Sequence, residues 1–143
     1  MKKKIIITGG LGYIGTELCK LYSGVSWHHQ IIVIDNRFIS ERVNQIRNWN
    51  MLFVQGDILN KEIVKQYFQD ADVVHHLAGV TKVPRTKSEA SDSQDIKIME
   101  VAEQGTQNIL DAIKKDCKII FPSTHVVYEG INEVRTNIKE NED

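Results

Sequence analysis

Short apolar runs alternate along the chain with segments whose apolar residues recur every three or four positions. Most of the runs are apolar at consecutive positions and rich in isoleucine and valine, as in strands of a parallel sheet covered on both faces. They occupy residues 4–8, 30–35, 51–54, 72–77 and 118–122. The alternation predicts an α/β fold: a doubly wound parallel sheet of the Rossmann type, with about five strands and helices on both faces.

Helical spacing fills the segments between these runs. The helix at about 13–22 ends at Ser23 and Gly24, and Ser40 and Asn60 are the candidate caps of the next two helices. A long helix is expected at about 94–115, after a polar loop at 80–93. The side chains expected to face the core are Ile14, Leu18 and Leu21 in the first helix, Val43 and Ile46 in the second, Ile63, Val64, Tyr67 and Phe68 in the third, and Ile98, Val101, Ile109, Ala112 and Ile113 in the last.

Three glycines, Gly9, Gly12 and Gly15, join the first strand to the first helix. Gly9 permits a sharp turn, Gly12 lets the backbone approach a phosphate, and Gly15 lets the helix lie against the sheet. A helix N-terminus carries free N–H donors and a partial positive charge, so it binds a pyrophosphate without a basic side chain. Asp35 follows about twenty residues later, where a carboxylate holds an adenosine ribose. This context favours a dinucleotide site over an ordinary strand-to-helix turn.

Composition and charge change this picture little. The 143 residues suit one domain, and a net charge of −1 does not indicate a nucleic-acid or membrane surface. Only three isoleucines follow the basic start, too few for a signal peptide, and no transmembrane run is present. Cys19 and Cys117 match no metal or redox spacing, and the five histidines share no ligand spacing. We therefore expect no metal and a reducing compartment, by default the cytoplasm.

Small or polar residues come directly after the expected strands: Asp35, Asp57, Ala78-Gly79 and Ser123-Thr124. The carboxyl ends of parallel strands meet at one edge of a sheet, and ligands of open α/β sheets bind there, where the strand order reverses. The sequence therefore predicts that these residues and the glycine turn converge on one crevice.

A set of motifs occurs in one order along the chain: 8–15 (TGGLGYIG), 35–36 (DN), 56–58 (GDI), 76–79 (HLAG), 105–110 (GTQNIL) and 123–128 (STHVVY). Together they resemble the extended short-chain dehydrogenases/reductases, in particular the NAD-dependent nucleotide-sugar epimerases and dehydratases. The resemblance covers essentially the whole chain. Two positions depart from it, because Gly79 stands where the family usually has alanine and Ala102 where asparagine is common.

The resemblance implies a role for each residue of the expected crevice. Its glycine turn, with the adjoining start of the helix, would surround the pyrophosphate, and the ends of later strands would hold the rest of the dinucleotide. The implied cofactor-binding residues are Gly9, Gly12, Tyr13, Ile14 and Gly15 at the pyrophosphate, Asp35 and Asn36 at the adenosine ribose, Asp57 and Ile58 at the adenine, Leu77, Ala78 and Gly79 at the pyrophosphate and nicotinamide ribose, and Ser123 beside them. For Asp57 alone, a carboxylate at a helix N-terminus is the alternative reading.

Asp35 favours NAD over NADP, because a carboxylate accepts hydrogen bonds from two ribose hydroxyls and repels a 2′-phosphate. Arg37 works against this preference, since a nearby arginine can accept a 2′-phosphate. NADP therefore stays open as the less favoured cofactor.

Thr124 occupies the position of the family's catalytic serine or threonine, which hydrogen-bonds the sugar hydroxyl being oxidised; a pair that caps a strand end is the alternative for Ser123-Thr124. The family's proton-abstracting tyrosine is followed four residues later by lysine, which lowers its pKa. None of the four tyrosines has such a lysine, and this motif would be expected just beyond Asp143.

We therefore expect residues 1–143 to be the dinucleotide-binding domain of such an enzyme, without the catalytic Tyr/Lys pair and the substrate-binding region. The whole enzyme would transfer hydride between a nucleotide-sugar hydroxyl and NAD, and this chain would bind the cofactor without turnover. The alternative is a non-catalytic dinucleotide-binding module for sensing or assembly. The fifth strand would either be left as an exposed edge or be paired by a second copy of the chain, since exposed edges recruit partners.

Overall fold

The computed structural model of the chain describes residues 1–80 and 92–123. Five parallel strands form one sheet in the order β3-β2-β1-β4-β5. The strands are β1 (Lys4–Thr8), β2 (Gln30–Asp35), β3 (Leu52–Gln55), β4 (Val73–His76) and β5 (Lys118–Ile120). The chain winds outward from β1 in both directions, so the strand order reverses between β1 and β4. The predicted doubly wound parallel sheet is confirmed.

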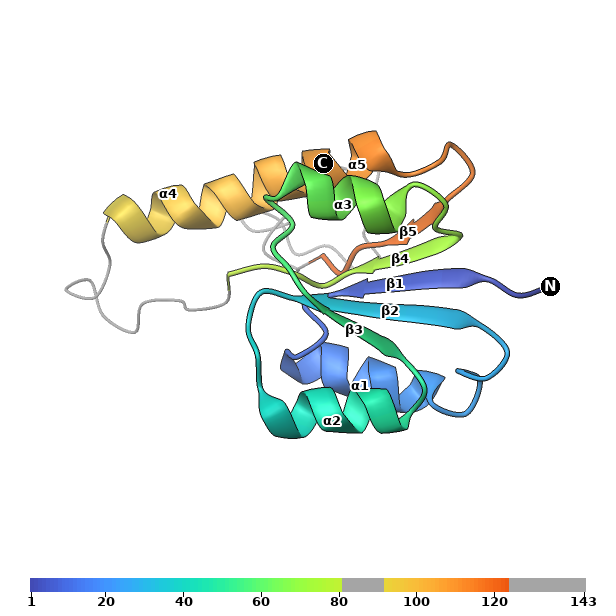
Figure 1. Cartoon of the computed structure of the whole chain (residues 1–143). Coiled ribbons are helices and arrows are strands. Elements are labelled where there is room, and N and C mark those ends of the chain that lie inside the picture. Colours follow the sequence, from blue (N-terminus) through green and yellow to red (C-terminus); the bar gives the residue numbers. More distant parts are fainter. Residues whose placement is uncertain (81–91, 124–143) are drawn as a thin grey trace, which may run out of the picture.

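Helices cover both faces of this sheet (Figure 1). On one face lie α1 (Tyr13–Tyr22) and α2 (Ser40–Asn48); on the other lie α3 (Lys61–Phe68), α4 (Asp92–Glu100), the π-helical turn η1 (Val101–Gly105) and α5 (Thr106–Ala112). Among the helices of the described residues, none is long and apolar enough to cross a membrane.

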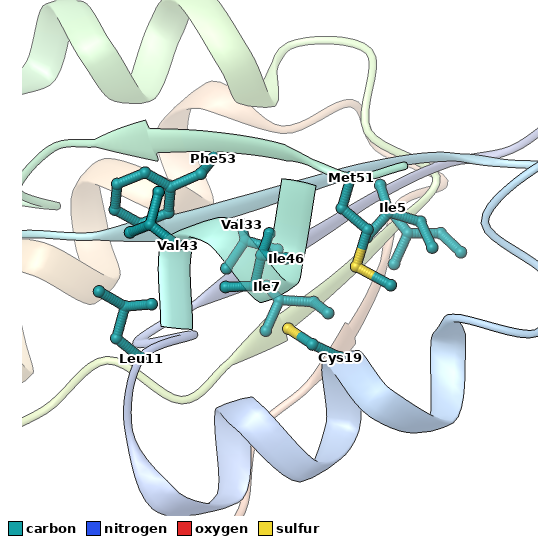
Figure 2. Packing of buried hydrophobic residues seen from close by; sticks show 10 residues of the cluster. Ile5, Ile7, Leu11, Cys19, Val33, Val43, Ile46, Met51 and Phe53 are labelled. Atoms are coloured by element: carbon teal, nitrogen blue, oxygen red, sulfur yellow. The ribbon is translucent and has the colours of Figure 1, made fainter. Parts of the chain in front are cut away.

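The core is split into two layers by the sheet, because successive side chains of a strand point to opposite faces. Ile5, Ile7 and Val33 pack against α1 and α2 together with Cys19, Val43 and other buried side chains of that layer (Figure 2). Ile6 and Ile32 point the other way, into a second layer with Val64, Phe68 and Ile109. Each fully buried aliphatic side chain contributes about 1.5–3 kcal/mol. The isoleucine-rich strands are therefore explained by burial on both faces.

The helix boundaries follow the sequence only in part. Asn60 caps α3 as expected, since its side chain accepts from the backbone N–H groups of Glu62 and Ile63. The expectation for Ser40 was wrong: Ser40 is the first helical residue of α2, and the N-cap is Ile39. The long helix expected at 94–115 is confirmed in part: helical backbone runs without a break from Asp92 to Ala112, with η1 as a π-helical turn inside it, and becomes extended at Ile113.

Strand β5 lies at one side of the sheet and pairs with β4. Its residues Lys118 and Ile120 are exposed. Such an edge offers unpaired backbone groups to a further strand. Pairing with a second copy of the chain stays a prediction.

Candidate functional site

The glycine turn between β1 and α1 is tightly folded. Gly9 has a φ of 64°, a left-handed conformation that only glycine adopts readily, and its carbonyl accepts from the Gly12 N–H at 2.9 Å. A Cβ atom on Gly15 would lie 2.4 Å from the Gly9 oxygen, so α1 rests directly on the turn. The first turn of α1 is thereby held at the carboxyl end of β1.

The N-terminus of α1 is open. Its first backbone hydrogen bond runs from the Thr16 N–H to the Gly12 carbonyl at 3.0 Å, so the N–H groups of Tyr13, Ile14 and Gly15 precede the helical ladder. Gly12 provides no capping side chain, and the first turn holds no acidic residue. These donors, with the helix dipole, form a site suited to an anion.

Asp35, at the end of β2, is tied to this turn. Its side chain is buried, and Oδ2 accepts from the Leu11 N–H at 2.9 Å. Oδ1 accepts from the backbone N–H of Arg37 at 3.0 Å. The Arg37 guanidinium adds two bonds, from Nε to Oδ1 at 3.0 Å and from Nη2 to Oδ2 at 3.2 Å, and this pairing raises the pKa of Arg37 above its usual value. The carboxylate therefore has four protein donors.

Asn36 and Asp57 join the ends of β2 and β3. The Asn36 amide donates to Asp57 Oδ2 at 3.1 Å, while Asp57 Oδ1 accepts from the Leu59 N–H at 3.0 Å. The side chain of Ile58 is buried, and its carbonyl accepts from the Asn108 amide at 3.0 Å. Asn108, on α5, thus holds the loop after β3 in place.

Thr8 links the glycine turn to the end of β4. Its Oγ1 accepts from the N–H groups of Leu77 at 3.1 Å and Ala78 at 3.0 Å, and lies 3.0 Å from His76 Nδ1. With both acceptor positions used, the hydroxyl donates its proton to Nδ1. The His76 ring is then neutral, and its Nε2–H donates to the Thr106 hydroxyl at 2.9 Å. Burial also lowers the pKa of His76, which agrees with a neutral ring.

A family model gives the decisive comparison: the 3-beta hydroxysteroid dehydrogenase/isomerase family matches residues 6–142. The chain belongs to this family. The resemblance to the extended short-chain dehydrogenases/reductases, which the motifs indicate, is thereby confirmed.

Among curated relatives, the UDP-N-acetyl-alpha-D-glucosaminuronate decarboxylase of Bacillus cytotoxicus is 33% identical over 130 residues, which cover 90% of this chain and 38% of the relative. The UDP-glucose 4-epimerase of Neisseria meningitidis serogroup C is 32% identical over 137 residues, which cover 88% of this chain and 38% of the relative. The chain thus spans less than half the length of these family members.

Solved structures give the same picture. The UDP-N-acetylglucosamine 4-epimerase from Methanobrevibacter ruminantium, in complex with UDP-N-acetylmuramic acid, matches with a TM-score of 0.73 and 26% identity, over 100% of this chain and 44% of that one. The UDP-glucose 4-epimerase of Thermus thermophilus, in complex with NAD, matches with a TM-score of 0.59 and 25% identity, over 76% of this chain and 33% of that one.

Most residues that the motifs of this family suggested lie at the carboxyl edge of the sheet. A hydrogen bond joins the glycine turn to Asp35, and Thr8, the residue before the turn, bonds Leu77 and Ala78. Asn36 and Asp57 meet beside them. Tyr13, Ile14 and Gly79 are exposed, and the bounds of α1 and β4 place them at the same edge. The expectation that Ile14 and Leu21 face the core was therefore wrong, because both side chains are exposed on α1. Thr124 falls outside the described residues.

Ser123 is exposed three residues beyond the end of β5. The ring of Phe121, from the same segment, lies 5.4 Å from that of His76, so the segment passes the end of β4. His75 points to the opposite face, where its Nε2 meets the Tyr22 hydroxyl at 2.7 Å. The two adjacent histidines therefore do not converge on one ligand.

Sequence reasoning missed three features of this site. The Thr8 hydroxyl, the His76 ring and the Asn108 amide tie neighbouring loops together, although none was singled out as a site residue. Asn108 left a detectable signal, because it is a polar residue next to Ile109 on the apolar side of a predicted helix. A buried polar side chain in such a place needs partners.

Proposed function

We propose that this chain binds NAD at the carboxyl edge of its sheet, as the cofactor-binding portion of an NAD-dependent nucleotide-sugar epimerase or dehydratase. The observation that carries the proposal is the hydrogen bond from the Leu11 N–H to Asp35, which holds a buried carboxylate next to the open N-terminus of α1. An anion site and a ribose-binding carboxylate, fixed at one switch point, are what a dinucleotide requires. Relatives and structural neighbours named as nucleotide-sugar epimerases support the same class.

The helix end formed by Gly12 to Gly15 binds the pyrophosphate, and the Asp35 carboxylate accepts the adenosine ribose hydroxyls. NAD is preferred over NADP because a 2′-phosphate would meet this carboxylate. Asp57 and Ile58 lie against the adenine. Leu77, Ala78 and Gly79 pass the nicotinamide ribose, and Ser123 flanks them.

The dinucleotide supplies the hydride acceptor for transient oxidation of a sugar hydroxyl. Thr124 hydrogen-bonds that hydroxyl and orients it; this role comes from its place in the 123–128 motif alone. The base of the reaction, a tyrosine paired with a lysine, has no match among the four tyrosines of the chain. The 143-residue chain therefore binds the cofactor without turnover, and NAD reduction by a pure sample would contradict this.

Calorimetric titration of the chain with NAD tests the binding site. The variant Asp35→Asn removes the charge that accepts the ribose hydroxyls, so its NAD affinity should fall about ten-fold or more. Asp116→Asn is the matched control, since Asp116 is an exposed aspartate outside the site and its replacement should leave binding unchanged. A folded wild-type chain that binds neither NAD nor NADP would refute the proposal.

A non-catalytic binding module would give the same titration. The coding sequence after Asp143 separates the two possibilities: a downstream Tyr-x-x-x-Lys favours the enzyme, and a stop codon favours the module. Cys19 and Cys117 are free thiols, which suits a reducing compartment, and we keep the cytoplasm as the proposed location.

A further inference from the structure

Asp35 has no free acceptor position in this structure. A carboxylate offers about four lone-pair positions, two on each oxygen. On Oδ1, one position takes the Arg37 N–H and the other the Arg37 Nε–H. On Oδ2, one takes the Leu11 N–H and the other an N–H of Arg37 Nη2. A ribose would bind here by donating its two hydroxyls to Asp35. In this structure the four acceptor positions of Asp35 are already filled by protein N–H groups.

The four bonds divide into two kinds. Two come from backbone N–H groups, of Leu11 and Arg37, and belong to the fold of the glycine turn and the β2 end. The other two come from the Arg37 side chain, one to each oxygen. If the guanidinium left, each oxygen would keep one backbone donor and gain one open position. That opening matches a vicinal diol, which presents one hydroxyl to each carboxylate oxygen.

The position of the guanidinium supports the same reading. A Cβ atom built on Gly12 would lie 4.0 Å from Arg37 Nη2, so the guanidinium lies beside the N-cap of α1 as well as on Asp35. An adenosine ribose held between a pyrophosphate on α1 and the Asp35 carboxylate needs this space. The Arg37 side chain is 54% exposed and that of Asp35 only 3%, so the arginine can swing into solvent while the carboxylate stays.

We propose that the Arg37 guanidinium stands in for the ribose diol on Asp35 and sets the NAD/NADP selectivity of the site. This inference rests on the proposed function. The two Arg37 side-chain hydrogen bonds to Asp35 are called the Arg37 fork. NAD must displace this fork to reach the carboxylate, which weakens NAD binding. A 2′-phosphate pairs with the displaced guanidinium, which offsets its repulsion by Asp35 and makes NADP less disfavoured. Arg37 thus narrows the preference for NAD that Asp35 creates.

The test compares wild-type chain, Arg37→Leu and Arg37→Gln by calorimetric titration with NAD and with NADP. Leucine and glutamine cannot form the charged fork, so the dissociation constant for NAD should fall about five-fold, the upper range for a partly exposed ion pair. The constant for NADP should rise by a similar factor, because the phosphate loses its cation. Arg47→Leu, at an exposed position in the last turn of α2, is the control and should change neither constant.

The outcomes separate the two proposals. Wild-type chain that binds NAD, with an unchanged or smaller preference for NAD over NADP in folded Arg37 variants, overturns the role of Arg37 and leaves the proposed function standing. If neither the folded wild-type chain nor any folded variant binds NAD or NADP, both the role of Arg37 and the proposed function are overturned. A variant that binds NAD more tightly and NADP less tightly than wild type supports the selectivity role, and glutamine provides a second measurement where leucine does not fold.

Discussion

Replacing Gly9 by alanine should destabilise the chain strongly. A methyl group there would lie 2.7 Å from the Leu77 carbonyl oxygen and 2.8 Å from the Ala78 nitrogen, both backbone atoms. This segment cannot move away freely, because the Thr8 hydroxyl accepts from the N–H groups of Leu77 and Ala78. Overpacking of this kind costs about 1–3 kcal/mol. Alanine at a φ of 64° adds about 1–2 kcal/mol. The two terms together predict a loss of about 2–5 kcal/mol in the free energy of unfolding.

Urea unfolding followed by circular dichroism measures this loss. With a slope of about 2 kcal/mol per molar urea, the midpoint should fall by roughly 1–2.5 M. The matched control is Gly24→Ala, because no atom lies within 4 Å of a methyl group there and Gly24 is not in the left-handed region. That variant should be unchanged or up to about 1 kcal/mol more stable. Equal midpoints for the two variants would refute the account of the turn.

Three further predictions concern single side chains. Thr8→Val should lower the free energy of unfolding by about 1–3 kcal/mol, since two backbone N–H groups lose their acceptor. Thr8→Ser keeps the hydroxyl, so urea unfolding should show most of the wild-type stability. Burial lowers the pKa of His76 from its ordinary 6.5, so the unfolded chain binds more protons below that pH; stability should fall as pH drops from about 6.5, and His76→Asn should flatten that slope. Burial raises the pKa of Cys19 to about 12, so a thiol reagent should label Cys117 first in native chain and reach Cys19 only on unfolding; equal rates would contradict the packing of α1.

The strands could be predicted closely because a strand that is buried on both faces needs apolar residues at consecutive positions, and that pattern is visible in the sequence. The bounds of β1 and β2 agree with the expected 4–8 and 30–35. The later strands differ at their ends: β4 covers Val73–His76 instead of 72–77, and β5 ends at Ile120, two residues before Pro122. Strand ends depend on where a neighbouring strand offers partners, and the chain's own pattern does not contain that information.

The π-helical turn η1 could not be predicted for a related reason. Its five residues carry an apolar pattern that also fits an ordinary helix, with Val101 and Gly105 buried on one side. Only the backbone hydrogen bonds distinguish the two forms. The side-chain periodicity therefore predicted one continuous helix up to Lys115, where the structure has α4, η1 and α5.

In the candidate site, too, the features that depend on local sequence could be predicted and those that depend on tertiary contacts could not. The glycine turn was predictable because its demands are local: a left-handed residue at Gly9 and close approach of the helix at Gly15. The Arg37 fork on Asp35 was not, although the two residues are close in sequence, because it depends on a rotamer. The bond from Thr8 to the β4 exit joins residues 69 and 70 positions apart, so it follows from the tertiary fold alone.

The central place of β1 also affects how the chain can fold during synthesis. One neighbour, β2, follows soon after, whereas the other begins at Val73, and Thr8 meets His76 across 68 residues. Contacts of such high contact order form slowly, since a long loop must close first. A nascent chain on the ribosome therefore carries its central, isoleucine-rich strand half-paired until β4 has emerged, and a chaperone that shields isoleucine-rich segments would act in that interval.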